Sequence, residues 1–586
     1  MMLRQWCSAP LVDTQAICNR LDAIEYLVGP ERDQFHSNLQ SYLRGIADVA
    51  RIFTRIKSRC ASLNEWKLLS QSISSYLAIT TLLRDAENSF QDPALPGLLK
   101  PTSSQSNVIE VSNLLNNIID FEGSMEEASI VIRAGVSNAL DAARQTHDDL
   151  DNVLTEVAHQ IQEKEPSLSS MTVQYIPQVG YVVCCDSPTT LPDFVFQFQE
   201  DDTTFYYKES CCRDLDESVG DIFGLIQDLQ RELLEELVVA LLHYEHALYE
   251  MIEVTARFDC FIALADAARC LQLKRPLITD ENEFVVKAAR HPLQELIVDN
   301  YISNDVALDT SRPILLITGQ NGSGKSVVLK MVGLIQYMAQ IGVYVPADEA
   351  RVGVVRKMFT RIHSFETASA SQSSFTIDCN QISRMLRHGR ERSLFLIDEF
   401  GKGTADADGS ALLAATVNYI ATLSISQMGP RAVITTHLLD IFRSGFVRGD
   451  QHETGNQAEL ESSQIGRRSP IACATMASIS TNEGSQSIRV FAPMHELQPG
   501  ISKFSNALGC ASTAGIPSRI IQRAAHVLER YQSHKSIEPI TSNDTSLKAH
   551  QQLLARFSSV EDWTTVSTDT LQEFLAAIKI CESRLQ

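Results

Sequence analysis

The chain has 586 residues, of which 44% are hydrophobic and 21% charged, and this length predicts roughly three to four folded domains with large cores. Its formal net charge of -22 excludes a protein that coats DNA with its whole surface, because nonspecific binding to nucleic acid depends on Lys and Arg displacing counterions. Any contact with DNA must therefore be local, topological or shared with a partner.

The 13 cysteines show neither zinc-ligand spacing nor a disulfide framework, which predicts a reducing compartment. The doublets Cys184-Cys185 and Cys211-Cys212 are interpreted as buried thiols of strands or turns. Residues 1–12 lack the sustained apolar region of a signal peptide. No stretch approaches the ~18 apolar residues of a membrane span, so we expect a soluble intracellular chain with no membrane contact.

The first part of the chain, residues 1–124, is predicted to be helical, because apolar residues recur every three or four positions along it. A stretch rich in Pro and Ser over 93–106 interrupts this pattern. A further helix is predicted over 108–121, and Gly123 is expected to end it.

The next part predicts an extended arm. One helical pattern covers residues 134–163, and another predicts a helix over 218–257 that would be about 58 Å long. Three alternating segments between them predict a small antiparallel sheet: Val173-Gln174-Tyr175, Phe194-Val195-Phe196-Gln197-Phe198 and Phe205-Tyr206-Tyr207. We assign residues 125–235 to an arm with a β tip and residues 236–280 to a returning helical segment.

The charge of the arm tip argues against a tight grip on phosphate groups. Residues 171–214 contain Lys208 and Arg213 as their basic side chains, against 7 acidic ones. Binding to a nucleic-acid backbone needs the opposite balance.

Residues 281–532 predict an α/β domain organised around the sequence Gly319-Gln320-Asn321-Gly322-Ser323-Gly324-Lys325-Ser326. This sequence follows an apolar run over 314–317 and precedes a helical pattern over 327–339, which is the context that a P-loop requires. Glycines there let backbone N–H groups face phosphates at a helix N-terminus. Lys325 would reach the β and γ phosphates and Ser326 would hold Mg2+, whereas the alternative is a chance glycine turn.

A second acidic motif supports the same site. The apolar run over 394–397 predicts a buried strand that ends in Asp398 and Glu399. In a parallel sheet such a strand end lies beside the P-loop, so Asp398 is predicted to help hold Mg2+ and Glu399 to polarise water as a base. An ordinary strand end is the alternative reading.

The other elements of this domain are predicted from shorter patterns. Strands are expected at 283–287, 347–355, 358–362, 432–436 and 487–495, and helices at 258–271 and 378–387. Residues 449–469 are interpreted as a polar loop insertion. Pro517 is expected in the first turn of a helix. The tail, 533–586, contains two amphipathic pieces over 547–557 and 571–580, which would cover a partner or the domain itself.

Several of these stretches together resemble the MutS family of DNA-repair and recombination ATPases. The resemblance runs from Leu3-Arg4-Gln5-Trp6 to Ala514-Gly515-Ile516-Pro517. Its most specific motifs are Arg290-His291-Pro292, the P-loop, Val345-Pro346-Ala347, Phe359-Thr360-Arg361-Ile362, Ser373-Ser374-Phe375 and Asp398-Glu399-Phe400-Gly401-Lys402-Gly403-Thr404. Within the family, the motifs are most similar to the branch of the fifth eukaryotic MutS homologue, whose members pair with the fourth as a meiotic clamp.

The resemblance implies a multidomain fold: a mainly α-helical lever, a paired-helix clamp arm with a small antiparallel β tip, and an α/β P-loop ATPase domain of the ABC type. It implies a composite site, in which each P-loop is completed across a dimer by the partner's signature serine, for which Ser373 stands here. It also matches Asn321 to the family's P-loop asparagine and His437 to its switch histidine. An ordinary loop serine and a strand-terminal histidine remain the alternatives. The segment 500–517 resembles the one that borders the adenine.

The sequence also departs from the family. Gln320 stands where proline is usual, Ala507 where glycine is frequent, and Arg356 where aspartate is usual. Nothing before Leu3 could form the N-terminal mismatch-reading and connector domains, so we expect either an incomplete reading frame or a member without those domains. The sequence Phe198-Gln199-Glu200 matches the Phe-x-Glu of mismatch readers and is interpreted as a coincidence.

The leading hypothesis is an ATP-gated DNA clamp that uses ATP and Mg2+. It would act as a heterodimer with the fourth MutS homologue on double-stranded or branched DNA, in crossover formation on chromosomes in the nucleus. Two alternatives remain: a mismatch-recognition repair subunit, and a scaffold that binds nucleotide without useful hydrolysis.

Overall fold

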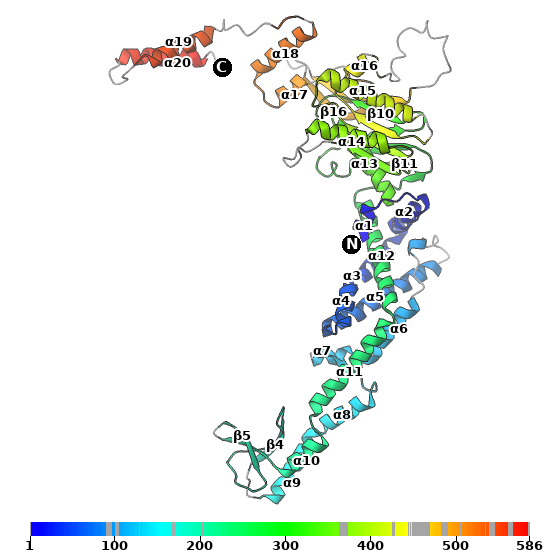
Figure 1. Cartoon of the computed structure of the whole chain (residues 1–586), viewed down its shortest axis with the longest axis vertical. Helices are drawn as coiled ribbons and strands as arrows, with labels where there is room; N and C mark the ends of the chain where they lie inside the picture. The colour runs from blue at the N-terminus through cyan, green and yellow to red at the C-terminus, as the bar shows by residue number, and fades with distance from the viewer. Residues whose placement is uncertain are drawn as a thin grey trace.

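The computed structural model describes residues 2–583 apart from 89–95, 100–104, 128, 167, 169, 202, 363–372, 425–427, 444, 446, 448–468, 482–489, 503–506, 534, 538–544 and 561–566. The molecule is elongated: an α/β unit lies at one end, a helical body in the middle and a small sheet at the other end (Figure 1). The predicted insertion over 449–469 falls outside the described residues except for Ser469.

The helical body combines the first part of the chain with a later helix. Its α-helices are α1 Met2–Ser8, α2 Thr14–Val28, α3 Asp33–Arg44, α4 Val49–Lys57, α5 Leu63–Asn88, α6 Gln105–Ile118 and α12 Glu245–Cys270, with 3-10 turns at Pro30–Arg32 and Gly97–Leu99. The side chains of Phe258 and Phe261 on α12 are fully buried among these helices. The predicted helical character of this region is therefore present.

The predicted end of α6 at Gly123 is wrong. The helix stops at Ile118 because the next residues form a short strand, β1 (Ile119–Asp120), which pairs with β2 (Val131–Ile132). Gly123 lies inside the following helix, α7 (Phe121–Glu126), where the Asp120 side chain accepts hydrogen bonds from the N–H groups of Glu122 and Gly123.

The long helix predicted over 218–257 is present with different bounds. It begins at Ile222, and α11 (Ile222–Leu242) and α12 are separated by His243 and Tyr244. These two residues donate backbone hydrogen bonds to the carbonyls three positions earlier, which tightens the last turn of α11. The helix predicted separately over 258–271 is the second half of α12.

The end of the molecule opposite the α/β unit carries a four-stranded antiparallel sheet in the order β3-β4-β6-β5 (Figure 1). Its elements are β3 Met171–Ile176, β4 Gly180–Cys185, β5 Val195–Asp201 and β6 Thr204–Lys208, flanked by α8 Asn138–Asp148, α9 Leu150–Lys164 and α10 Ser210–Ser218. The prediction missed β4. Cys184 and Cys185 lie on that strand, but Cys211 and Cys212 lie on helix α10 rather than on a strand or turn.

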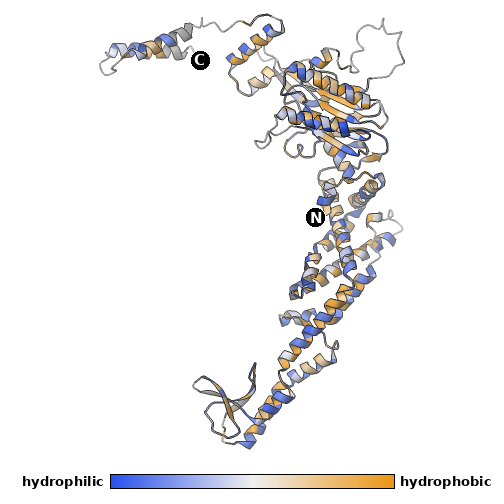
Figure 2. Cartoon of the chain, in the orientation of Figure 1, coloured by the Kyte–Doolittle hydropathy of each residue, from blue (hydrophilic) through white to orange (hydrophobic). Residues whose placement is uncertain are grey.

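The α/β unit is built on a six-stranded sheet in the order β12-β13-β14-β10-β15-β16. These strands are β12 Lys357–Arg361, β13 Ser393–Asp398, β14 Arg431–Thr435, β10 Ile314–Thr318, β15 Ile471–Thr481 and β16 Val490–Pro499. All neighbours are parallel except β15 and β16. Figure 2 shows hydrophobic colouring in this unit, as expected for parallel strands buried on both faces.

Helices cover both faces of this sheet. Leu315 and Ile317 of β10 face the core shared with α13 (Lys325–Ile341), while Ile314 and Leu316 face the core shared with α14 (Ser374–His388) and α15 (Asp406–Leu423). A short helix, α16 (Asp440–Arg443), follows β14. A second sheet, in the order β7-β11-β8-β9, is formed by β7 Leu277–Thr279, β11 Glu349–Gly353, β8 Phe284–Ala289 and β9 Asn304–Leu308.

The C-terminal helices lie beyond the sheet. They are α17 Ala507–Thr513, α18 Ser518–Gln532, α19 Thr545–Ser558 and α20 Thr568–Ser583. Pro517 precedes the first turn of α18 rather than lying in it. The two predicted amphipathic pieces pack on each other, with the rings of Phe557 and Phe574 5.8 Å apart, and lie away from the α/β unit (Figure 1).

Within the part of the chain that the structure describes, none of the helices has the length and apolar character needed to cross a membrane.

We predict that Leu316→Ala lowers the free energy of unfolding of the α/β unit by about 2–5 kcal/mol, because this fully buried side chain leaves a cavity behind. Leu293→Ala is the matched control. Leu293 is 62% exposed, so its loss should change the free energy of unfolding by less than about 0.5 kcal/mol. Differential scanning calorimetry measures both effects, and equal thermal midpoints for the two variants would contradict this core.

Candidate functional site

The glycine-rich loop connects the central strand β10 to helix α13. Gly319, Gly322 and Gly324 have φ angles of +146°, +77° and +102°, a region that favours glycine over residues with a side chain. A Cβ atom on Gly324 would also lie 3.3 Å from the His495 ring. The loop therefore needs glycine both for its turn and for its packing. It ends at the N-terminus of α13, where backbone N–H groups attract anions.

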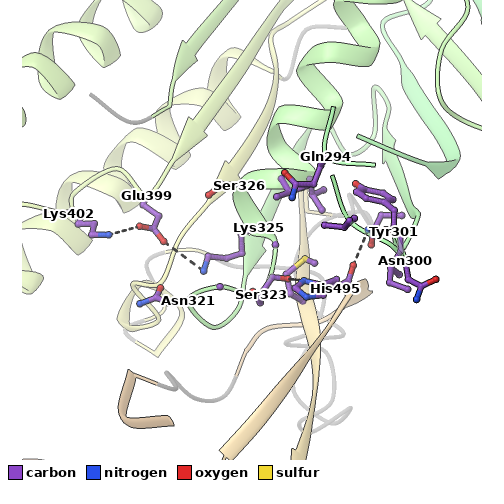
Figure 3. A pocket seen from close by; sticks show the side chains of 18 residues that line it. Gln294, Asn300, Tyr301, Asn321, Ser323, Lys325, Ser326, Glu399, Lys402 and His495 are labelled. Atoms are coloured by element: carbon purple, nitrogen blue, oxygen red, sulfur yellow. Dashed lines mark hydrogen bonds and ion pairs between the residues drawn. The ribbon is translucent and has the colours of Figure 1, made fainter. Parts of the chain in front are cut away.

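Lys325 is the first residue of α13 and is only 4% exposed. Its ammonium group donates to the carbonyls of Gly319 and Gln320 at 3.0 and 2.9 Å, and lies 3.8 Å from Glu399 (Figure 3). Burial lowers the pKa of Lys325, while the carboxylates of Glu399 and Asp398 act in the opposite direction. The ammonium group of Lys325 is thus bound by carbonyls of the glycine-rich loop itself.

Ser326 and Asp398 meet although 72 positions separate them. The Ser326 hydroxyl donates to Asp398 Oδ1 at 2.9 Å, and the Thr435 hydroxyl donates to the same oxygen. Asp398 ends β13 and Thr435 ends the neighbouring strand β14, which in turn adjoins β10. Hydroxyl and carboxylate oxygens at this separation are ligands that Mg2+ accepts, so the donor set fits that ion.

Glu399 follows β13 in a left-handed conformation, with φ of +49°. Its N–H donates to the Thr435 carbonyl at 3.0 Å, and its Oε2 accepts from Lys402 at 3.0 Å (Figure 3). Burial alone raises the pKa of Glu399, but the hydrogen bond and charge of Lys402, together with Lys325 and His437, outweigh it and lower that pKa. Glu399 is therefore a carboxylate at neutral pH.

His437 follows β14 and is half-buried beside Glu399. Its Nδ1 lies 3.9 Å from Glu399 Oε1 and has no hydrogen-bond partner among the described residues. Burial lowers the pKa of His437 and outweighs the Glu399 carboxylate, which raises it, so the ring is neutral at pH 7. A buried ring nitrogen without a partner is rare in folded proteins. It fits a site that receives a phosphate oxygen or a water molecule.

A cavity of about 720 Å³ opens beside the loop. Its lining includes Asn321 to Val328, Glu399, Lys402, Met476 and His495. Figure 3 shows Glu399 and Lys402 on one side and Asn300 and Tyr301 on the other. This volume lies within the ~300–1,000 Å³ of small-molecule sites.

Sequence reasoning missed Tyr301 and His495, and it expected the segment 500–517 to border the base. That segment does reach the loop, since the Cys510 thiol donates to the Asn321 carbonyl at 3.5 Å. The opposite wall, however, comes from residues 294–304 and from His495, whose Nδ1 donates to the Ser323 carbonyl at 3.1 Å. The Arg290-His291-Pro292 motif, which directly precedes residues 294–304 in the sequence, was the available signal that this segment borders the site.

Five predicted site residues are not among those that line this cavity: Gly319, Gln320, Ser373, Asp398 and His437. Asp398 and His437 still contact the lining residues Ser326 and Glu399. Gln320 donates to the Ser478 hydroxyl on β15 at 3.3 Å and is buried. Ser373 is exposed and caps α14, accepting a hydrogen bond from the Thr376 N–H at 3.2 Å. The predicted start of this helix at Asp378 is wrong, because the Ser373 cap allows it to begin at Ser374. The structure thus gathers the loop, Asp398, Glu399 and His437, and leaves Ser373 outside.

Comparison with known proteins agrees with the order of these elements. The family model MutS domain III matches residues 1–265, and MutS domain V matches residues 315–532. MutS protein homolog 5 from Saccharomyces cerevisiae is 27% identical over 558 residues, which cover 89% of this chain and 60% of that protein. MutS protein homolog 5 from Caenorhabditis elegans is 25% identical over 98% of this chain and 40% of that protein.

Bacterial relatives match to a similar degree. DNA mismatch repair protein MutS from Synechococcus sp. (strain CC9902) is 30% identical over 540 residues, which cover 90% of this chain and 55% of that protein. The chain therefore spans between 40% and 60% of the length of these three relatives. With two family models matched in chain order, and with similarity to MutS homolog 5 from two organisms, the chain belongs to the MutS family.

Proposed function

We propose that the chain binds ATP with Mg2+ and hydrolyses it. The observation that carries this proposal is the hydrogen bond between Ser326 and Asp398 beside the buried ammonium of Lys325. A hydroxyl, a carboxylate and a desolvated cation at one helix N-terminus are the groups that a magnesium nucleotide requires. Membership of the MutS family agrees with this assignment.

Each residue has a distinct part in this proposal. Lys325, which now contacts the carbonyls of Gly319 and Gln320, would bind the β and γ phosphates. Ser326 and Asp398 would hold Mg2+, which would neutralise phosphate charge. Glu399 is ionised and orients the attacking water as a base. His437, neutral and without a hydrogen-bond partner on Nδ1 among the described residues, is suited to contact the γ phosphate or that water. Tyr301 and His495 border the space for the nucleoside.

We further propose that the working form is a heterodimer with the fourth MutS homologue. Ser373 supports this, because an exposed hydroxyl at the N-terminus of α14 could cap a phosphate of a second chain but lies outside the cavity of its own. The lever and clamp-arm assignments, with the bounds given above, belong to the same proposal. Similarity to two proteins named MutS homolog 5 supports action on meiotic recombination intermediates, on chromosomes in the nucleus.

As a clamp, the dimer would encircle double-stranded or branched DNA rather than grip it with the arm tip. The acidic tip and the net charge of -22 support encirclement, because a closed ring needs little direct attraction to phosphates. ATP binding would favour the closed state and hydrolysis the open one. The second candidate, mismatch recognition, is supported by the 30% identity to a protein named DNA mismatch repair protein.

We predict that Lys325→Ala abolishes ATP hydrolysis by removing the cation that meets the phosphates. The matched control is Lys330→Ala, an exposed lysine five residues further along the same helix, which should leave turnover unchanged. Steady-state phosphate release by the purified heterodimer measures both. Equal turnover in the two variants would contradict the nucleotide site.

Glu399→Ala is predicted to lower the hydrolysis rate by about 10²–10⁴-fold, which is the usual contribution of a general base. ATP should still bind. A single-turnover assay together with a fluorescent-nucleotide titration separates the two steps. If the wild-type chain binds ATP without hydrolysing it, the scaffold alternative is favoured instead.

The clamp hypothesis predicts equal affinity for matched and mismatched duplexes, and ATP-dependent retention on circular DNA that is lost when the DNA is linearised. Binding to fluorescent duplexes and retention on immobilised circles measure these properties. Markedly tighter binding to a mismatch would favour the repair alternative.

A further inference from the structure

A buried arginine connects the end of β13 to helix α14. Arg361 ends β12, is 7% exposed, and has no part in the mechanism above. One nitrogen of its guanidinium donates to the backbone carbonyl of Asp398, and another donates to the carboxylate of Asp378. Asp378 is itself only 2% exposed and belongs to α14.

These contacts place Asp398 between two attachments. Its carboxylate accepts from Ser326 of the glycine-rich loop and from Thr435, and its carbonyl accepts from Arg361. Any change in the position of Asp398 therefore also moves the acceptor of the Arg361 guanidinium. Because Arg361 presents its donors in a rigid planar fork, it passes such a change to its second acceptor, Asp378.

Helix α14 is held differently along its length. Its second half is anchored by Ile382 and Met385, which are buried against Phe395 and the neighbouring core. Its first turn, by contrast, contains no buried residue, and Asp378 is the first side chain of the helix that is buried. The ion pair with Arg361 is thus the deep attachment nearest to the Ser373 cap.

An ion pair is a costly way to attach a helix, because two buried charges lose their hydration. Apolar contacts of the kind made by Ile382 and Met385 avoid that cost. The polar pair adds directional contacts to the strand end that carries Asp398. This favours a role in positioning over a role in stability alone.

We propose that Arg361 and Asp378 couple the nucleotide site of this chain to the N-terminus of α14. Mg2+ and ATP at Lys325, Ser326 and Asp398 then set the position and order of the helix turn that carries Ser373. This inference rests on the proposed ATP binding. In the heterodimer it would let the nucleotide state of one site reach the surface that completes the other, so Arg361 is a positioning residue rather than a catalytic one.

The test measures backbone hydrogen exchange in the first turns of α14, residues 374–380, in the full chain. Exchange is followed by mass spectrometry without nucleotide, with a non-hydrolysable ATP analogue and Mg2+, and with the same analogue and EDTA. We expect the magnesium complex to slow exchange there by on the order of 5-fold or more, the lower range of coupling between sites. The analogue without Mg2+ should have no such effect, because Asp398 responds through the cation.

Two variants remove the connection without emptying the site. Arg361→Lys keeps the charge but cannot span both acceptors, and Asp378→Asn keeps the shape but loses the charge. Both should bind the analogue within about 3-fold of the wild-type affinity, a change small beside typical coupling between sites, and lose the response in α14. Arg384→Lys, an exposed substitution on the same helix, is the matched control and should keep the response.

The outcomes separate this inference from the proposed function. If the wild-type chain does not bind the analogue, the proposed ATP site is wrong. If it binds but α14 does not respond, or if both variants respond as the wild type does, the coupling is overturned while ATP binding stands. Unchanged exchange in α13 and an unchanged thermal midpoint show that a variant is folded. If Arg361→Lys does not fold, the nearly isosteric Asp378→Asn tests the coupling by itself.

Discussion

The hydrogen bond between Ser326 and Asp398 depends on the order of strands in the large sheet. Strand β14 lies between β10 and β13, and both pairings are parallel, so the three carboxyl ends lie at one edge. The glycine-rich loop follows β10, and His437 lies just after β14. Asp398 and Glu399 lie at the end of β13. A different order of the same strands would separate the hydroxyl from the carboxylate and leave no place for a cation.

The α/β unit is joined to the helical body by a continuous hydrophobic core. Buried residues of α2 and α12 belong to the same cluster as the inner face of α13. Polar contacts reinforce this junction: the Arg20 guanidinium donates to the Ile341 carbonyl at 2.6 Å, and the Gln340 side chain donates to the Leu11 carbonyl at 2.9 Å. Because α13 begins at Lys325 and ends at this junction, this single helix connects the glycine-rich loop to the helical body.

Charge is distributed differently at the two ends of the molecule. Three cations close to the glycine-rich loop or to Asp398 are buried or paired: Lys325 contacts carbonyls of its own loop, Lys402 contacts Glu399, and Arg361 contacts Asp378. The arm tip is acidic, and its strands instead bury aromatic side chains such as Tyr181 and Tyr207. A buried cation at the glycine-rich loop and an acidic sheet at the other end are therefore compatible with a strongly acidic chain.

Local patterns were enough to predict part of this structure. The sequence from 314 to 341 folds as strand, loop and helix because apolar runs, glycines and a helical periodicity occur there in direct succession. The buried run before Asp398 and three of the four strands of the tip were predictable for the same reason, whereas β4 was missed. The grouping of the loop with Asp398 and Glu399 followed from a general rule about parallel strands rather than from any single residue.

Other features were decided only by tertiary structure. Tyr301 and His495 form one cavity wall because Asn304 joins β9 to β16, donating to the His495 carbonyl and accepting from the Leu497 N–H across more than 190 positions. The pairing of Arg361 with Asp378 and the break at His243 left no periodic signal either. The sequence by itself determined which segments form strands, helices and the glycine-rich loop, since those depend on neighbouring residues. Only the folded chain decided which distant side chains share a site, because that depends on strand order and on contacts between elements far apart in sequence.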